Sequence, residues 1–272
     1  MYYILAFCVL IGFIYINQHW LIVTKYSIVT SKLPKEMNGL KIVQISDLHY
    51  ATFGDRQKNL IQKVKNEKPD LIFITGDLVD RFRYDLQQSL DAVKGFIEIA
   101  PVYYITGNHE EELNVKDEIA EKLTQMGAHV LFNNSDYFVK KDVAIQIVGI
   151  DDPISGKNAQ EMLDLALKDD QTYKVLLAHR PEDYKTYEKF GIDLTFNGHE
   201  HGGIIRIPGI GGLINHNFDL FPTHIEGIEK SGGLTQVISR GLGNSGPTFR
   251  VFNRPEIVVA ELWHDQSMQD SK

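Results

Sequence analysis

Several side chains able to bind metal ions stand where apolar runs of the sequence end. Leu40–Ser46 is followed by Asp47 and His49, and Leu71–Thr75 is followed by Asp77. The full set of candidate ligands is Asp47, His49, Asp77, Asn108, His179, His199 and His201. Carboxylate, amide and imidazole donors have intermediate hardness, so the set suits Mn, Fe or Zn and suits a calcium cage poorly. Each residue alone would more often be structural, and only their joint placement predicts a metal centre.

The elements expected around these residues bring them to one edge of a sheet. Short apolar runs that alternate with helix-length polar segments are typical of βαβ units, in which parallel strands all point the same way. Ligands at the ends of successive parallel strands therefore converge on one rim. The strands expected to end at this rim are Leu40–Ser46, Leu71–Thr75, Pro101–Thr106, Val175–Ala178 and Leu194–Asn197.

The rest of the chain continues this alternation. Apolar residues at helical spacing predict four helices, at Asp55–Glu67, Leu86–Ile99, Val115–Met126 and Ala159–Leu167. Further strands are expected at Trp20–Ser31, Ala128–Phe132, Thr235–Ser239 and Glu256–Leu262, with a hairpin formed by Asp136–Lys140 and Val143–Ile150. The order predicts two βαβ-rich halves that close on each other. The expected fold is α/β, a four-layer α/β/β/α sandwich of two mixed β-sheets flanked by helices, with an N-terminal membrane-anchor helix.

The N-terminal apolar run, Tyr2–Ile16, is nearly long enough to span a membrane. A spanning helix needs roughly 20 apolar residues, and tyrosines and Trp20 could anchor a slightly shorter one at the interfaces. A signal peptide or a core element is the alternative, but no Lys or Arg precedes the run and no small-x-small cleavage site follows it. We therefore expect a transmembrane anchor over 1–19, one catalytic domain over 20–265 and a polar tail over 266–272.

Charge and cysteine content narrow the possible functions. Lysines follow the anchor and none precedes it, so the positive-inside rule predicts a single-pass protein of the cell membrane with its domain in the cytoplasm. The net charge of -8 argues against a general nucleic-acid binder, because such proteins normally carry a basic face. The single cysteine, Cys8, excludes an intrachain disulfide and a thiolate zinc site.

Five short blocks occur in a recognisable order. They are Asp47-x-His49, Gly76-Asp77-x-x-Asp80, Gly107-Asn108-His109-Glu110, the strand-end His179, and Gly198-His199-x-His201. With these blocks the chain resembles the calcineurin-like metallophosphoesterases. The N-terminal run, Lys32-Leu33-Pro34 and the stretch from Ser239 to Ile257 are similar to the membrane-anchored bacterial branch of that superfamily, which includes phosphoesterases resembling UDP-2,3-diacylglucosamine pyrophosphatase.

The resemblance implies a role for each candidate. One divalent metal ion (Mn, Fe or Zn) would be bound by Asp47, His49, Asp77 and His201, and a second by Asp77, Asn108, His179 and His199. A shared carboxylate implies metals about 3.5–4 Å apart, which would generate a bridging hydroxide for in-line attack on phosphorus. His109 is the implied general acid, and Glu110 is expected to fix its tautomer. Asp80 is expected to lie outside the ligand set.

The implied activity is hydrolysis of a phosphoester or pyrophosphate, either small or linked to a lipid or nucleotide. Arg240, Arg250 and Arg254 lie in a Gly-rich segment expected to curl over the rim, where at least one would pair with a substrate phosphate. Solvated surface arginines are the alternative interpretation. Broad-specificity phosphodiesterase, cyclic-nucleotide phosphodiesterase and phosphoprotein phosphatase stay open. A non-catalytic scaffold is disfavoured, because every expected ligand and His109 are present.

Overall fold

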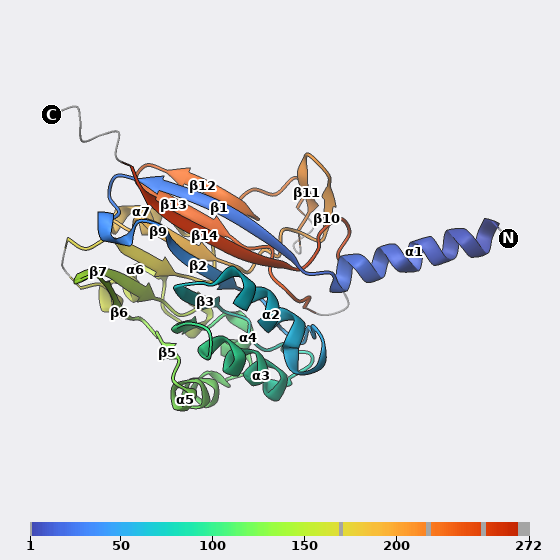
Figure 1. The fold of residues 1–272 in the computed structure, drawn as a ribbon, viewed down its shortest axis with the longest axis horizontal. Helices are drawn as coiled ribbons and strands as arrows, with labels where there is room; N and C mark the ends of the chain where they lie inside the picture. The colour runs from blue at the N-terminus through green and yellow to red at the C-terminus, as the bar shows by residue number, and fades with distance from the viewer. Residues whose placement is uncertain (1, 169–170, 216–218, 246–248, 266–272) are drawn as a thin grey trace.

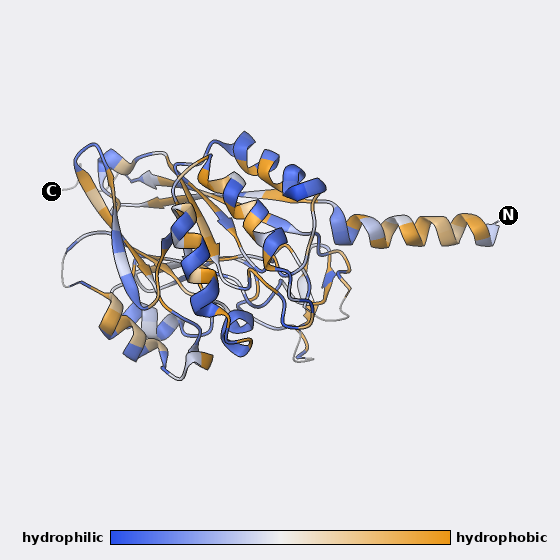
Figure 2. Cartoon of the chain, turned by 90° about the horizontal axis from the view of Figure 1, so that it is seen from below, coloured by the Kyte–Doolittle hydropathy of each residue, from blue (hydrophilic) through white to orange (hydrophobic). Residues whose placement is uncertain are grey.

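The computed structural model describes residues 2–168, 171–215, 219–245 and 249–265, and the expected tail 266–272 lies outside these ranges. A helix, α1 (Tyr2–His19), extends away from an α/β body (Figure 1). Apolar residues run along most of α1 (Figure 2), and nearly all of its side chains are exposed. Within the described ranges, α1 is the one helix long and apolar enough to cross a membrane, judged by length and composition.

The first of two large sheets has the strand order β1-β14-β2-β3-β4-β5. Strands β2 to β5 run parallel, whereas β14 is antiparallel to β2 and parallel to the edge strand β1. The bounds are β1 (Ile22–Thr30), β2 (Leu40–Ile45), β3 (Leu71–Thr75), β4 (Val102–Ile105), β5 (His129–Val130) and β14 (Glu256–His264). Because β2, β3 and β4 are parallel neighbours, their carboxyl ends meet at one edge of the sheet.

The second sheet has the order β12-β13-β9-β8-β7-β6, with β13, β9, β8 and β7 parallel and both edge strands antiparallel. The bounds are β6 (Asn134–Lys140), β7 (Val143–Gly149), β8 (Lys174–Leu177), β9 (Leu194–Asn197), β12 (Gly227–Ser231) and β13 (Leu234–Ile238). A small hairpin of β10 (Ile205–Ile207) and β11 (Gly211–Ile214) stands apart, beside the base of α1 (Figure 1).

Helices cover the outer face of each sheet, and the two inner faces pack together. On the first sheet lie α2 (Lys58–Glu67), α3 (Leu86–Ile97) and α5 (Lys116–Met126), and on the second lie α6 (Ala159–Ala166) and α7 (Tyr184–Lys189). Between the sheets, Phe73 and Phe196 meet edge to face with ring centroids 5.1 Å apart. The predicted four-layer α/β/β/α sandwich with two mixed sheets is confirmed. Short helical segments are η1 (Lys35–Met37), η2 (Asp55–Gln57), α4 (Asn108–Glu112) and η3 (Pro153–Ser155).

A few elements differ from the sequence prediction. The helix expected over Asp55–Glu67 is split, because Arg56 and Gln57 have positive φ and separate η2 from α2. The hairpin β10–β11, strand β12 and helix α7 were not predicted. They are short, and β12 is an edge strand with Ile228 as its one apolar residue, so neither length nor apolar periodicity marks them.

Candidate metal centre

The turns that follow the strands of both sheets place the predicted ligands together. Five of these residues have a left-handed backbone with positive φ: Asp47, His49, Asp77, His199 and His201. Non-glycine residues rarely adopt this conformation, and it costs about 1–3 kcal/mol each unless the surroundings hold it in place. Here, the amides of Asp47 and His49 donate to the carbonyls of Gly76 and Asp77, at 3.1 and 3.0 Å. Backbone strain concentrated at one rim indicates a functional site.

Asp47, His49, Asp77 and His201 form one buried cluster. Their candidate ligand atoms all lie within 4.8 Å of one another. Nε2 of His49 is 3.2 Å from Nε2 of His201, and Nε2 of His201 is 3.5 Å from Oδ1 of Asp47. The structure thus brings together the four residues implied as ligands of the first metal ion.

Two close approaches involve residues implied for the second ion. Oδ2 of Asp77 is 3.3 Å from Nε2 of His179 and 3.8 Å from Nε2 of His49. Oδ1 of Asn108 is 3.0 Å from Nδ1 of His199. Oδ2 of Asp77 therefore lies between histidines assigned to different ions, where a bridging carboxylate would be required. That bridging role stays a prediction.

The hydrogen-bond partners of the cluster leave donor atoms directed into the site. Nδ1 of His179 donates to the Thr75 carbonyl at 2.7 Å, and Nδ1 of His201 donates to the Gly243 carbonyl at 3.2 Å. Backbone bonds of this kind fix the tautomer and make Nε2 the ring atom that can bind a metal ion. Nε2 of His179 and Oδ2 of Asp47 are buried with no hydrogen-bond partner among the described residues. Orphaned buried atoms of this chemistry fit metal binding, because a bound cation would satisfy them.

Electrostatics at the rim favour bound positive charge. Burial raises the pKa of the Asp47 carboxyl to about 6, and burial lowers the pKa of His49 to about 3. Burial opposes protonation of His179, but the Asp77 carboxylate beside it raises the pKa of His179 to about 10. Burial would raise the pKa of Asp77, yet the neighbouring histidines, His179 foremost, hold it well below its usual range. Two carboxylates held this close in a buried site require cations or protons to compensate them.

His109 lies beside the cluster with a defined tautomer. Its Nδ1 accepts a hydrogen bond from the backbone N–H of Arg81 at 2.9 Å, so the proton of the neutral ring is on Nε2. Nε2 is 3.2 Å from Oγ of Ser245 and 3.9 Å from Oδ2 of Asp77. The atom that carries the proton therefore faces the ligand cluster, which is the geometry a proton donor needs.

The expectation that Glu110 fixes the His109 tautomer is wrong. The Glu110 carboxylate is fully buried and accepts backbone N–H groups of Asp77, Leu78, Val79 and Gly107, at 2.6–3.1 Å. Burial raises its pKa to about 7, although two of these bonds, from Gly107 and Val79, act in the opposite direction. Glu110 therefore holds the turn after β3 against the start of α4, and the backbone of Arg81 orients His109.

Asp80 lies where sequence reasoning expected it, outside the ligand cluster. Its Oδ1 accepts the backbone N–H groups of Phe82 and Arg83, and its buried Oδ2 is 3.6 Å from Nδ1 of both His49 and His109. These three residues are close enough to enclose an ion. However, Nδ1 of His109 already accepts from Arg81, so we interpret Asp80 as a carboxylate that orients the His49 ring.

The three arginines of the Gly-rich segment have different surroundings. Arg250 is only 3% exposed and donates to Asn244 Oδ1, the Arg240 carbonyl and the Gly243 carbonyl, at 2.8, 3.0 and 2.5 Å. Arg240 forms an ion pair with buried Glu256 at 2.7 Å. Arg254 is half-buried and lies over the Trp20 ring, 5.9 Å from its centroid. The segment does curl over the rim, because the Gly243 amide donates to the Asp47 carbonyl at 2.7 Å. Contact between any of these arginines and substrate stays a prediction.

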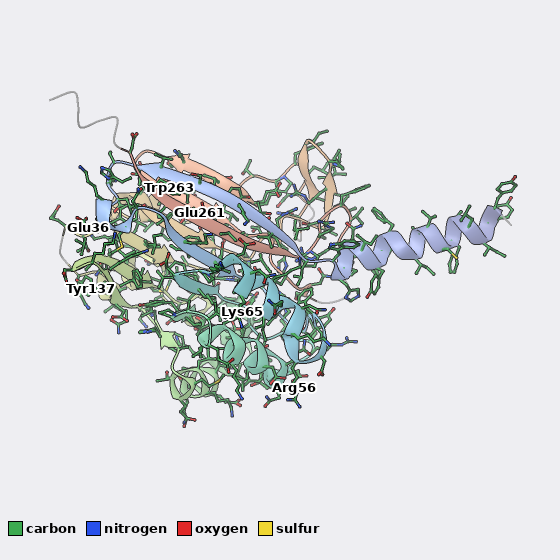
Figure 3. The ribbon with its side chains drawn as sticks, viewed as in Figure 1. Glu36, Arg56, Lys65, Tyr137, Glu261 and Trp263 are labelled. Carbon is green, nitrogen blue, oxygen red and sulfur yellow. The ribbon has the colours of Figure 1, made fainter. Side chains whose placement is uncertain are left out.

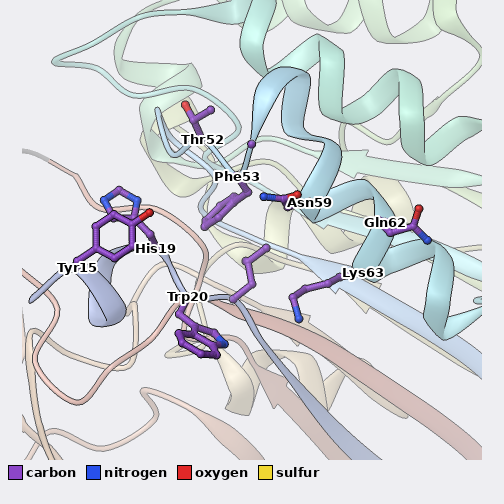
Figure 4. Close-up of a pocket in the computed structure, with 10 residues that line it drawn as sticks. Tyr15, His19, Trp20, Thr52, Phe53, Asn59, Gln62 and Lys63 are labelled. Carbon is purple, nitrogen blue, oxygen red and sulfur yellow. The ribbon is translucent and has the colours of Figure 1, made fainter. Parts of the chain in front are cut away.

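Two neighbouring cavities lie at the base of α1. The first, of about 480 Å³, has Tyr15, His19 and Trp20 on one side and residues of α2, including Lys63, on the other (Figure 4). The second, of about 410 Å³, is lined by Gln18, Tyr50, Gly243, Asn244 and Phe249, among others. Both cavities share His19 and Thr52 as lining residues, so they lie next to each other.

Sequence reasoning missed two side chains at the site. Nη1 of Arg180 is 3.0 Å from Nε2 of His199, while its Nε donates to Asp152 at 2.8 Å. Ser245 contacts His109 as described above. Arg180 directly follows His179 in the sequence, and this position could have singled it out, whereas nothing local to Ser245 indicates its contact.

The Asp, Asn and His residues at the carboxyl ends of strands from two packed sheets form a candidate centre for divalent metal ions. The family model described as calcineurin-like phosphoesterase matches residues 40–203, more than half of the chain, and the chain belongs to this family. The chain is therefore a metal-dependent phosphoesterase. Its family and its buried cluster indicate divalent metal ions as cofactors.

Relatives share most of the chain length. The chain is 29% identical to the uncharacterized metallophosphoesterase YkuE of Bacillus subtilis, over 91% of this chain and 87% of that protein. It is 29% identical to the phosphodiesterase YaeI of Escherichia coli, over 82% of each. It is also 27% identical to a transmembrane protein with metallophosphoesterase domain of Danio rerio, over 87% of this chain and 56% of that protein.

Proposed function

We propose that the chain is a phosphodiesterase or pyrophosphatase with two divalent metal ions, tethered to a membrane by α1 and acting on a lipid-linked or nucleotide-linked substrate. The observation that carries the two-metal part is the position of Asp77 Oδ2, at 3.8 and 3.3 Å from His49 and His179, which belong to different halves of the donor set. A donor set divided around one carboxylate suits two ions better than one.

The proposed chemistry assigns separate tasks to the ions and to the chain. Two bound divalent ions would activate water as a nucleophile at neutral pH and neutralise charge on the phosphoryl oxygens. Nε2 of His109 carries the proton and faces the cluster, so His109 would protonate the leaving oxygen.

The membrane part of the proposal has two supports. α1 is long and apolar enough to span a bilayer, and a Danio rerio relative is named a transmembrane protein. The cavity lined by Gln18 and His19 reaches Gly243 and Asn244 above the metal cluster, so a substrate embedded in the membrane would have a short path to the site. We place the domain on the cytoplasmic side, because lysines follow α1 and none precedes it.

Steady-state kinetics of the purified full chain would test the proposal. The protein would be loaded with Mn, Fe or Zn and assayed against bis-p-nitrophenyl phosphate, p-nitrophenyl phosphate and a nucleotide-lipid pyrophosphate. We expect metal-dependent turnover with kcat/KM higher for the diester and the pyrophosphate than for the monoester. Preference for the monoester would favour a phosphoprotein phosphatase, and no turnover with two bound metals would favour a scaffold.

A broad-specificity phosphodiesterase is the second candidate, and the relative named phosphodiesterase YaeI favours it. The two candidate functions differ in the substrate preference that they predict. A lipid-specific enzyme should prefer the nucleotide-lipid pyrophosphate over bis-p-nitrophenyl phosphate, whereas a broad-specificity enzyme should not.

A further inference from the structure

Exposed apolar side chains surround the base of α1, although a soluble domain would normally bury side chains of this size. Six of them are more than half exposed, and they come from separate parts of the chain: Trp20, Ile210, Leu220, Phe221, Phe249 and Phe252. Large apolar side chains that are exposed together in one region mark a site of interaction.

Contacts place these side chains around one end of the domain. The Phe252 ring meets Phe13 of α1 with centroids 5.0 Å apart, and Phe249 lines the same cavity as Gln18 and His19. Val251, between these two phenylalanines, pairs with Ile205 of β10 in a β-bridge. The stretch 249–252 therefore links α1 to the β10–β11 hairpin.

The same hairpin carries the remaining members of the group. Ile210 lies in its turn, where its amide donates to the Ile207 carbonyl at 3.0 Å. Leu220 forms a bridge with Ile214 of β11, and the Phe221 amide donates to the Leu213 carbonyl at 2.9 Å. Figure 1 shows β10 and β11 beside the base of α1.

This end of the domain also covers the metal centre. Asn244 donates to Gln18 Oε1 at 2.6 Å and accepts from Nε of Arg250 at 2.8 Å. Arg250 in turn donates to the Gly243 carbonyl, the acceptor of His201. A short chain of hydrogen bonds thus joins the last turn of α1 to a metal-ligand histidine.

We propose that Trp20, Ile210, Leu220, Phe221, Phe249 and Phe252 form a docking surface that inserts into the headgroup region of a bilayer and holds the metal rim against it. The proposal rests on the membrane anchoring by α1 proposed above and adds a second, separate contact with lipid. Its consequence is that a lipid phosphodiester or pyrophosphate reaches the metal cluster without leaving the membrane.

A lipid surface fits this docking surface better than a protein partner. The apolar side chains adjoin α1, the helix long enough to span a bilayer, so they would lie at its interface if α1 is inserted. Trp and Phe are suited to that depth. Three basic residues have long stems that can reach lipid phosphates. Arg254 lies over Trp20, Lys63 lines a cavity with Trp20, and Arg83 lines a cavity with Phe249.

Tryptophan quenching by lipids can test the docking, because the chain has two tryptophans. Trp263 lies towards the end of the domain away from α1 (Figure 3). The full chain with Trp20→Phe and Trp263→Phe would receive one new tryptophan, Phe249→Trp or Leu220→Trp, and be reconstituted into phosphatidylcholine vesicles with brominated acyl chains. Val139→Trp is the matched control, because Val139 is also exposed but lies on β6, at the far end.

The single cysteine provides an independent report on α1. Cys8 lies in the middle of the helix and is exposed, so a fluorophore attached to it reports whether α1 is inserted. We expect quenching of the Cys8 label and of both Phe249→Trp and Leu220→Trp, to an extent comparable with native Trp20, and none for Val139→Trp. Two test positions guard against a single variant that fails to fold.

The remaining outcomes separate the two proposals. Quenching at Cys8 without quenching at either test tryptophan would overturn the docking surface, leave the anchor intact and assign the exposed side chains to a protein partner. An unquenched Cys8 label would overturn the anchor and, with it, the docking that depends on it. Quenching of Val139→Trp equal to that of the test variants would also overturn the proposal, because the contact would then be non-specific.

Discussion

At the scale of single residues, the metal rim contains two carboxylates that each accept a backbone hydrogen bond through one oxygen. Oδ1 of Asp77 accepts the His109 amide at 2.9 Å, and Oδ1 of Asp47 accepts the His199 amide at 3.0 Å. Each carboxylate is thereby oriented by the backbone of another block, and each keeps an oxygen close to the site histidines, Oδ2 in Asp77 and Oδ1 in Asp47. The rim is preorganised, because orientation does not depend on a metal ion being bound.

Asp77→Asn is expected to lower occupancy of both metal sites, because Oδ2 of Asp77 lies close to His49 and His179, which belong to different halves of the donor set. Asn108→Ala is expected to lower occupancy of the second site only, since Asn108 contacts His199 and belongs to that half. Metal content per chain, measured by inductively coupled plasma mass spectrometry after dialysis, distinguishes the two variants. Loss of a single equivalent in both variants would contradict the bridging assignment.

His109→Ala is expected to retain both metals but to lose activity selectively. The loss should be roughly a hundredfold or more on alkyl phosphodiesters, whose leaving oxygen needs a proton, and much smaller on p-nitrophenyl esters. Measuring kcat on the two substrates, together with metal content, tests whether His109 is the general acid. An equal loss on both would show that His109 does not act as the general acid.

At the scale of elements, the site is made by turns that follow parallel strands, and their glycines allow very close approach. A Cβ atom at Gly198 would lie 1.9 Å from Oγ of Ser46 and 2.5 Å from Oδ2 of Asp47. The turn after β9 is therefore packed directly on the first metal ligand after β2. This contact joins the two sheets across the rim.

Gly198→Ala is accordingly expected to displace Asp47 and lower occupancy of the first metal site. Gly191→Ala is a suitable control, because it strains the backbone, with φ of +70°, but its added Cβ meets no atom within 4 Å. Metal content and thermal unfolding should separate the variants: the control loses some stability and keeps its metals. Full metal content in Gly198→Ala would mean that the turn can relax without moving Asp47.

Much of this element arrangement could be predicted from the sequence, because each ligand block follows an apolar run. The alternation typical of βαβ units was enough to predict that strands end at Asp47, Asp77 and Asn108. The roles of Glu110 and Arg250 could not be predicted, since they depend on which backbone groups a distant turn presents. A carboxylate beside a histidine in sequence suggests that the two are paired. The backbone of Arg81, 28 residues upstream of His109, in fact takes that position.

At the scale of the whole molecule, α1 is both an appendage and a neighbour of the active site. Its last turn contacts the segment over the metals through Gln18 and Asn244, while most of its length contacts nothing in the domain. The domain core does not need the helix, because its three apolar clusters contain no residue of α1.

Deleting residues up to about Gln18 is therefore expected to give a folded protein that still binds its metals. The full chain should resist extraction of membranes with alkaline carbonate, and the truncated chain should be released, because only a spanning helix makes the attachment integral. Circular dichroism and metal content check the fold. A truncated chain that resists extraction would show that the integral attachment lies elsewhere.

The last prediction separates two arginines that sequence reasoning treated alike. Arg240→Ala removes the ion-pair partner of Glu256, which is 1% exposed, and should destabilise the protein by about 3 kcal/mol. Arg240→Ala should lower metal affinity and should therefore lower activity on every substrate to a similar extent. Arg254 has no such buried carboxylate partner among the described contacts and lies towards the proposed docking surface, over Trp20. Arg254→Ala should therefore leave the unfolding temperature nearly unchanged.

For Arg254→Ala, we expect a selective loss of roughly 1.5–3 kcal/mol in kcat/KM for a lipid-linked pyrophosphate, the scale of one hydrogen bond to a charged phosphate. Hydrolysis of bis-p-nitrophenyl phosphate, which has no second phosphate, should barely change. Kinetics on both substrates in the same vesicles, with denaturant titrations of each variant, measure the two effects separately. A parallel loss on both substrates would assign Arg254 to the fold, because a residue that only positions the second phosphate cannot slow a substrate that lacks it.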